Sequence, residues 1–483
     1  MKKLICMILG VCILLCSCQA GNNQPSEDEH PQETLQTIEQ LQMQKGMNIQ
    51  AGLYFYDSAS SKLVSETREF VVTQEQNVGE ELMAQLLAGP TNQSLHGISY
   101  GTELVDIEVM DEVANVYLKA TKDLSAYEQY VLRAAVTDTL VDYYGLAYVN
   151  VFIDGATNYE AHPKGAFKKS SGTLDSDFAK YQNNYLQNTS NTPEGSGALQ
   201  SNVVLYFADT TLGFLLPEIR QVSFEDSNRI VDTLISELIL GPSYGNNMQG
   251  LMSQDIVNEY TYELVENETG HIQCNLRLQY PVNVLPNSSQ ELDKLCYASL
   301  FYTLRSVIPS LDTLHITLEY LEQDNQITLT REDVKQYLGR TIDLYFPGKD
   351  FTMLYPTKRV VYNKEAGMLR TRLDQLIRGP IASDSEEIWP IFSQGITSKD
   401  VLSVEIYDNS IAVVDLSQNF SDVMSSQPAE TEFVTIYTMV NTLTGYTGIK
   451  KVKFMVEGKE ILGFTGELYL KNPLMKNPGI IKE

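Results

Sequence analysis

The tripeptide Leu-Tyr-Phe stands at Leu53–Phe55, Leu205–Phe207 and Leu344–Phe346, and the dipeptide Gly-Pro follows it at Gly89–Pro90, Gly241–Pro242 and Gly379–Pro380. The step from the leucine to the glycine is 36 residues in the first two copies and 35 in the third. Two marks that keep their spacing through three copies indicate one module repeated in tandem. A chain of this kind devotes its length to repeated surface, which argues against one large active site.

The apolar pattern predicts the same order of elements in each copy. In copy three, strands Leu402–Tyr407 and Ile411–Leu416 flank a turn, a helix runs from about Glu430 to Leu443, and strand Val452–Val456 closes the module. In all three copies the positions two, three and six residues before the Gly-Pro glycine are apolar, which indicates a helix with one buried face that ends there. The predicted order is β-β-α-β-β-α-β per copy. The predicted fold class is α+β, as three tandem small α/β sandwich modules with helices packed on a mixed or antiparallel sheet.

The N-terminus has the pattern of an export signal. The basic pair Lys2–Lys3 precedes an apolar run, Leu4–Leu15, which is too short to span a bilayer. The tetrapeptide Leu15–Cys18 resembles a bacterial lipobox, which implies cleavage between Ser17 and Cys18 and a lipid anchor on Cys18. A plain secretory signal that happens to contain cysteine is the alternative.

Composition divides the rest of the chain into domains and connecting segments, because some stretches are polar and too poor in apolar residues to form a core. The predicted division is a lipoprotein signal peptide (1–17), a lipid-anchored flexible tether (18–48), domain 1 (49–156), a flexible linker (157–201), a more divergent domain 2 (202–322), a linker (323–341), domain 3 (342–461) and a C-terminal tail (462–483).

The formal net charge is −27. An acidic chain repels nucleic acid and anionic lipid, so we expect no nucleic-acid partner and a membrane contact made through the lipid on Cys18 alone. Beyond the signal and the anchor only Cys274 and Cys296 remain. Their apolar neighbours favour two buried thiols over a disulfide or a metal pair, although the spacing does not decide whether they pair.

No pattern for catalysis, cofactor binding or metal binding survives inspection. Gly97–Gly101 matches G-x-S-x-G, but a helix precedes Ser99 and a strand follows it, which is the reverse of a nucleophile elbow. The histidines have no metal-ligand spacing and no calcium loop occurs. We therefore predict no catalytic residue, no cofactor and no metal. The chain has 28 tyrosines, and a glycan-binding platform of exposed tyrosines stays open as an alternative.

The succession of Leu-Tyr-Phe, helix, Gly-Pro, the hairpin strand Ala412–Ser417, helix, strand and Glu-Gly resembles the GerMN domain, named for a sporulation and spore germination protein of Gram-positive bacteria. Copy two departs from it, with Glu319–Leu321 in place of the final Glu-Gly. Copy one has Asn115–Leu118 where the family often shows an aspartate. The resemblance implies extracytoplasmic, often lipid-anchored proteins without assigned catalytic residues. It also implies a fold similar to ring-building modules.

These features together lead us to expect a non-enzymatic lipoprotein on the outer face of the cell membrane, with a structural or assembly role in sporulation or spore germination and protein partners in the envelope. A module that binds peptidoglycan or a germination ligand is the alternative, and an exposed row of tyrosines beside a groove would favour it. An extracytoplasmic hydrolase is the weakest alternative, because it would need Ser, His and Asp side chains that converge.

Overall fold

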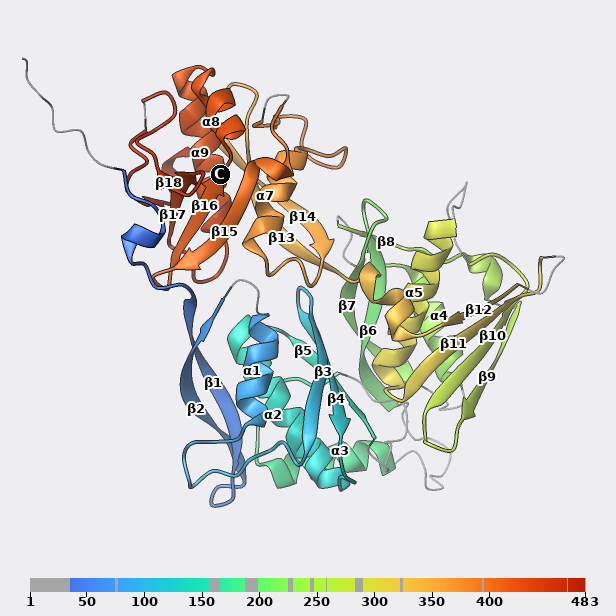
Figure 1. The fold of residues 1–483 in the computed structure, drawn as a ribbon. Helices are drawn as coiled ribbons and strands as arrows, with labels where there is room; N and C mark the ends of the chain where they lie inside the picture. The colour runs from blue at the N-terminus through green and yellow to red at the C-terminus, as the bar shows by residue number, and fades with distance from the viewer. Residues whose placement is uncertain are drawn as a thin grey trace, which may run out of the picture.

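A computed structural model describes residues 35–73, 77–155, 166–186, 199–224, 229–243, 247–257, 259–282, 290–321, 325–392, 395–466 and 468–482. The three copies are distinct modules that contact one another (Figure 1). Copy one is blue to cyan, copy two green to yellow, and copy three orange to red. Within the described residues, no helix is both long and apolar enough to cross a membrane.

Copy one has the predicted order of elements. They are β1 (Met47–Asp57), β2 (Lys62–Val72), α1 (Val78–Leu87), β3 (Thr102–Val109), β4 (Val113–Ala120), α2 (Ala126–Tyr144) and β5 (Tyr148–Asp154). β1 and β2 form an antiparallel hairpin, while β4 pairs antiparallel with β3 and parallel with β5. α2 contacts both β1 and β5, so it lies between the hairpin and the three-stranded sheet. This position explains why its residues from Gln129 to Leu140 are buried on every side of the helix.

Copies two and three repeat this order with additions. Copy two consists of β6 (Leu199–Asp209), β7 (Leu215–Phe224), α4 (Ile230–Leu240), β8 (Met248–Gln249), β9 (Tyr260–Glu266), β10 (Ile272–Leu278), α5 (Gln290–Val307), β11 (Leu311–Leu318) and β12 (Asn325–Leu329). Copy three consists of β13 (Gly339–Pro347), β14 (Leu354–Tyr362), α7 (Leu369–Arg378), β15 (Val401–Tyr407), β16 (Ile411–Leu416), α8 (Gln418–Ser425), α9 (Ala429–Leu443), β17 (Lys451–Val456), β18 (Lys459–Glu460) and β19 (Leu474–Met475). The predicted α+β fold with a mixed sheet is confirmed in each copy.

The Gly-Pro mark ends the first helix of every copy. Gly89, Gly241 and Gly379 follow α1, α4 and α7, and their φ angles are 92°, 77° and 81°. Only glycine adopts such angles without strain, and the proline that follows cannot continue the helix. The repeated dipeptide is therefore a backbone requirement.

In each copy an arginine contacts both the Leu-Tyr-Phe motif and the Gly-Pro motif. Arg68, Arg220 and Arg359 each donate to the carbonyl of the Gly-Pro glycine, at 3.0, 2.9 and 3.4 Å. Each guanidinium also lies over the phenylalanine ring of Leu-Tyr-Phe, 5.8–5.9 Å from the ring centroid. A carboxylate neutralises each arginine: Glu66, Glu218 and Asp384 respectively. The arginine stands fifteen residues after the leucine in all three copies, a regularity that the sequence analysis missed.

A threonine of the second helix forms the other repeated bond. The backbone N–H groups of Tyr54, Tyr206 and Tyr345 donate to the hydroxyls of Thr139, Thr303 and Thr442, each at 3.1 Å. These N–H groups would otherwise be left without an acceptor between the hairpin and the helix. The repeat therefore preserves internal bonds of the fold, not a reactive group.

The flexible linker predicted over 157–201 is wrong for residues 166–186. Phe167 forms an isolated bridge with Val149 of β5, and α3 (Leu174–Leu186) places the ring of Phe178 5.4 Å from the ring of Tyr130 on α2. The polar composition concealed these aromatic residues, whose burial against α2 holds the segment on copy one.

Three other segments also belong to the folded bodies. The tether predicted over 18–48 contains residues 36–46, which bond to copy three. The linker predicted over 323–341 contains β12, which extends the sheet of copy two, and the short helix α6 (Arg331–Val334). The predicted tail, 462–483, contributes β19, which pairs with β17, and the carbonyl of Lys471, which accepts from Lys453 Nζ at 2.6 Å.

Candidate functional site

The predicted site residues Ser17 and Cys18 lie outside the described residues, so lipidation stays a prediction. Ser99 is followed by β3, as the sequence indicated, and its carbonyl accepts from the Thr102 N–H at 2.8 Å. His96 bonds through Nε2 to Ser58, not to Ser99. Ser99 therefore takes part in a turn, without the neighbours of a nucleophile.

The two remaining cysteines are free and fully buried. Burial raises the pKa of both thiols, Cys274 and Cys296, to about 12, so neither is reactive at neutral pH. Across the described part of the chain, no group of three or more His, Cys, Asp or Glu side chains could hold a metal ion.

The contact between copies one and two is charged and buried. Glu108 of β3 is 1% exposed, and its Oε1 lies 3.1 Å from Arg331 Nε of α6. Arg331 also pairs with Asp106 and lies 3.9 Å from the ring centroid of Tyr117. The Tyr117 hydroxyl donates to Glu108 at 2.8 Å. The segment after copy two thus brings a cation to the sheet of copy one.

Burial and ion pairing shift the pKa values of these carboxyl groups in opposite directions. Burial raises the pKa of Glu108, although Arg331, Tyr117 and Asn115 act to lower it. For Asp106 burial also acts upward, but the bonds to Lys364 and Arg331 outweigh it and its pKa is lowered. The pKa of Arg331 is raised by these carboxylates. The arginine therefore keeps its charge, and its loss would leave Glu108 without a cation.

Copies one and three share a single apolar core that continues from one to the other. At its edge Thr341 of β13 donates to Asp111 through its N–H at 2.8 Å and its hydroxyl at 2.6 Å. Lys364, after β14, donates to Asp106 at 2.6 Å. Asp106 thus binds cations from both Arg331 and Lys364, and copy one contacts both of its neighbours.

The outer face of the mixed sheet, away from the copy's own helices, has a different neighbour in each copy. In copy one, Asn115 and Tyr117 on β4 face copy two, where Asn115 bonds to the Tyr206 hydroxyl. In copy three, Lys453 and Met455 on β17 are buried beneath the chain's own C-terminal segment.

The same face in copy two is exposed or half-buried, and we call it the open face. It is formed by alternate residues of β9–β12: Thr261, Glu263, Gln273, Asn275, Arg277, Thr313, His315, Thr317, Gln326 and Thr328. A depression of about 370 Å³ lies along it. Hydroxyl and amide groups dominate this surface, so it presents hydrogen-bond donors and acceptors to solvent.

The chain thus consists of repeated small α+β modules that contact one another, copy one through the outer face of its sheet. Residues 52–159 and 343–462 match the Germane family, described as sporulation and spore germination. The first and third copies thus match the Germane family model, as the resemblance implied. Copy two lies outside both matched regions, although its elements follow the same order.

Solved structures include similar chains. The tandem GerMN domains of the sporulation protein GerM from Bacillus subtilis match at 18% identity, over 57% of this chain and 98% of that one, with a TM-score of 0.23. The first GerMN domain of the same protein matches at 22% identity, over 28% and 96%, with a TM-score of 0.23. A protein named as a lipoprotein of Clostridium perfringens matches at 22%, over 27% and 90%, with a TM-score of 0.17. No curated protein gives a significant match.

Proposed function

We propose that this chain is a membrane-anchored, extracytoplasmic lipoprotein that acts in sporulation or spore germination by holding another envelope protein, without catalysis. The family of copies one and three supports the process. The ordered basic head, apolar run and Leu15–Cys18 tetrapeptide support the anchor.

The observation that supports the assembly role is that the outer face of the sheet is covered in copies one and three and open in copy two. Copy one uses the outer face of its sheet to contact copy two, which supports a role for this face of the module in binding a protein. Copy three covers the same face with its own chain. Copy two leaves it open, with polar groups suited to a hydrated, hydrogen-bonded interface. We propose that the open face receives the envelope partner.

A substitution that places a bulky charged side chain on the open face tests this proposal. Thr317→Arg on β11 should reduce spore yield or germination to the level of a deletion strain, while the protein stays folded and at normal abundance. Ser236→Arg, on an exposed position of α4, is the matched control and should have no effect. Normal sporulation and germination with Thr317→Arg and Asn275→Arg combined would overturn the proposed interface.

A further inference from the structure

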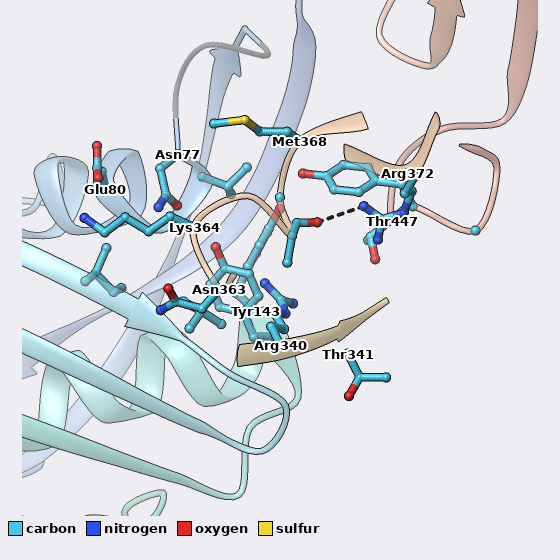
Figure 2. Close-up of a pocket in the computed structure, with 18 residues that line it drawn as sticks. Asn77, Glu80, Tyr143, Arg340, Thr341, Asn363, Lys364, Met368, Arg372 and Thr447 are labelled. Atoms are coloured by element: carbon cyan, nitrogen blue, oxygen red, sulfur yellow. Dashed lines mark hydrogen bonds between the residues drawn. The ribbon is translucent and has the colours of Figure 1, made fainter. Parts of the chain in front are cut away.

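A pocket of about 400 Å³ lies between copies one and three. Copy one contributes the start of α1, part of β3 and the end of α2, with Tyr143 and Tyr144. Copy three contributes Arg340 from β13, the 363–368 segment, Arg372 from α7 and the turn after α9. Figure 2 shows Tyr143, Arg340 and Asn363 close together in the middle of this lining. The volume is in the range of small-molecule sites.

Arg372 is the unusual residue of this pocket. It is 8% exposed, yet no described carboxylate forms an ion pair with it. One nitrogen donates to the Ala366 carbonyl at 2.8 Å, and its Nε has no partner. The guanidinium lies 5.0 Å from the ring centroid of Tyr446. Burial, together with the nearby charge of Arg340, lowers the pKa of Arg372 to about 10.

Four other arginines with little exposed surface show what Arg372 lacks. Arg68 and Arg359 each have a carboxylate oxygen at 2.6 Å, and Arg220 and Arg331 also have carboxylate partners. A buried cation without a counter-charge is unfavourable, so proteins normally supply one. Among the described residues, the exposed Asp343 is the carboxylate that acts on Arg372, and Glu80 lies at the exposed rim of the pocket.

Asn363 gives an independent indication of a ligand. Its side chain is 5% exposed, and neither its amide nitrogen nor its amide oxygen has a partner. Arg340 lies 5.7 Å from the ring centroid of Tyr144, and no described residue forms an ion pair with it. Polar groups left unpaired in a cavity lose free energy unless a ligand or water satisfies them.

We propose that this pocket binds a small organic anion, with its carboxylate or phosphate group held by Arg340 and Arg372 and its apolar part packed against the tyrosines. The chain as a whole is strongly acidic, so this attraction is local to the pocket. Guanidinium groups bind both anions through paired hydrogen bonds. Because the lining comes from copies one and three, the ligand would also connect them. This ligand site goes beyond the proposed function, which needs a protein partner only.

Calorimetry on the full chain in detergent micelles tests the site with three probes of similar shape. Benzoate carries a carboxylate, phenyl phosphate carries a phosphate, and benzamide is neutral. We expect benzoate, phenyl phosphate or both to bind, and benzamide to bind at least about 10-fold more weakly, since a charge-assisted hydrogen bond contributes about that factor. Preference for one anion identifies which group the natural ligand carries.

The variants locate the binding. Arg340→Gln, at a half-buried position, should weaken the anion at least about 10-fold without unfolding the chain. Asn363→Asp places a carboxylate in the pocket and should abolish binding. Arg378→Gln removes the same charge from an exposed position of α7 and should leave binding unchanged. Binding of benzamide as tight as that of the better-binding anion, no binding of either anion, or full affinity in folded Arg340→Gln would each overturn the proposal. A defect in sporulation with Thr317→Arg would still support the partner surface if the pocket proposal fails.

Discussion

Loss of Arg331 should separate copies one and two. Arg331→Met keeps an unbranched apolar stem and removes the charge, which leaves Glu108 buried at 1% exposure with only neutral hydrogen-bond donors. Removal of one member of a buried ion pair costs about 3–5 kcal/mol. The Tyr117 and Asn115 bonds to Glu108 remain, and Lys364 still neutralises Asp106. We therefore expect the lower end, about 3 kcal/mol.

Urea unfolding followed by circular dichroism measures this effect. With a slope of roughly 2 kcal/mol per molar, the midpoint of the affected transition should fall by about 1.5 M. Glu332→Gln, next to Arg331 but exposed, should change stability by less than about 0.5 kcal/mol. The double variant Glu108→Gln with Arg331→Met should recover more than half of the loss, because no buried charge is then left unpaired. A single-variant loss below about 0.5 kcal/mol, or a double variant no more stable than the single, would refute the role of this ion pair.

Three more outcomes follow from the described contacts. Asp138 has a pKa raised to about 6, chiefly by burial, so the free energy of unfolding should fall as pH rises from about 4 to about 6 and the buried carboxylate ionises. Asp138→Asn should remove this pH dependence and stabilise the chain at pH 7 by at most about 3 kcal/mol. An unchanged pH dependence in urea unfolding of Asp138→Asn would contradict this. Thr303→Val should cost about 1–3 kcal/mol because the Tyr206 N–H loses its acceptor, whereas Thr303→Ser keeps the acceptor and should cost less; equal losses in urea unfolding would count against the repeated bond. Cys18→Ala should abolish fatty-acid labelling and release the protein from membranes, and retention of both would show that the anchor lies elsewhere.

The elements within each copy could be predicted because their signals are local. Apolar periodicity, the turn before Ile411 and the Gly-Pro helix end each act within a few residues. The order of strands and helices was therefore right in all three copies. Arg68, Arg220 and Arg359 show an equally regular spacing, since each follows its leucine by fifteen residues. That spacing predicts no contact by itself, because the groups that each arginine binds are known only from the folded structure.

The contacts between copies could not be predicted, because they depend on the tertiary arrangement. Nothing near Arg331 in the sequence points to Glu108, 223 positions earlier. The same reason explains why the sequence predicts a linker over residues 166–186: their aromatic side chains gain a partner only when α2 has formed. The pocket likewise needs Tyr144 and Arg372 from two copies, so neither copy's own pattern reveals it.

The N-terminal segment has a mechanical consequence. Before entering β1, residues 36–46 run along copy three (Figure 1), where Gly46 donates to the Ile406 carbonyl at 2.8 Å and Glu460 donates to the Gln36 carbonyl at 2.9 Å. Lys45 adds an ion pair with Glu405 at 2.9 Å. A pull applied through the N-terminal end would therefore load copy three, the last module in sequence, before it reaches copy one. Tension on the chain would be borne first by these bonds, and their rupture would lengthen the molecule while all three modules remained folded.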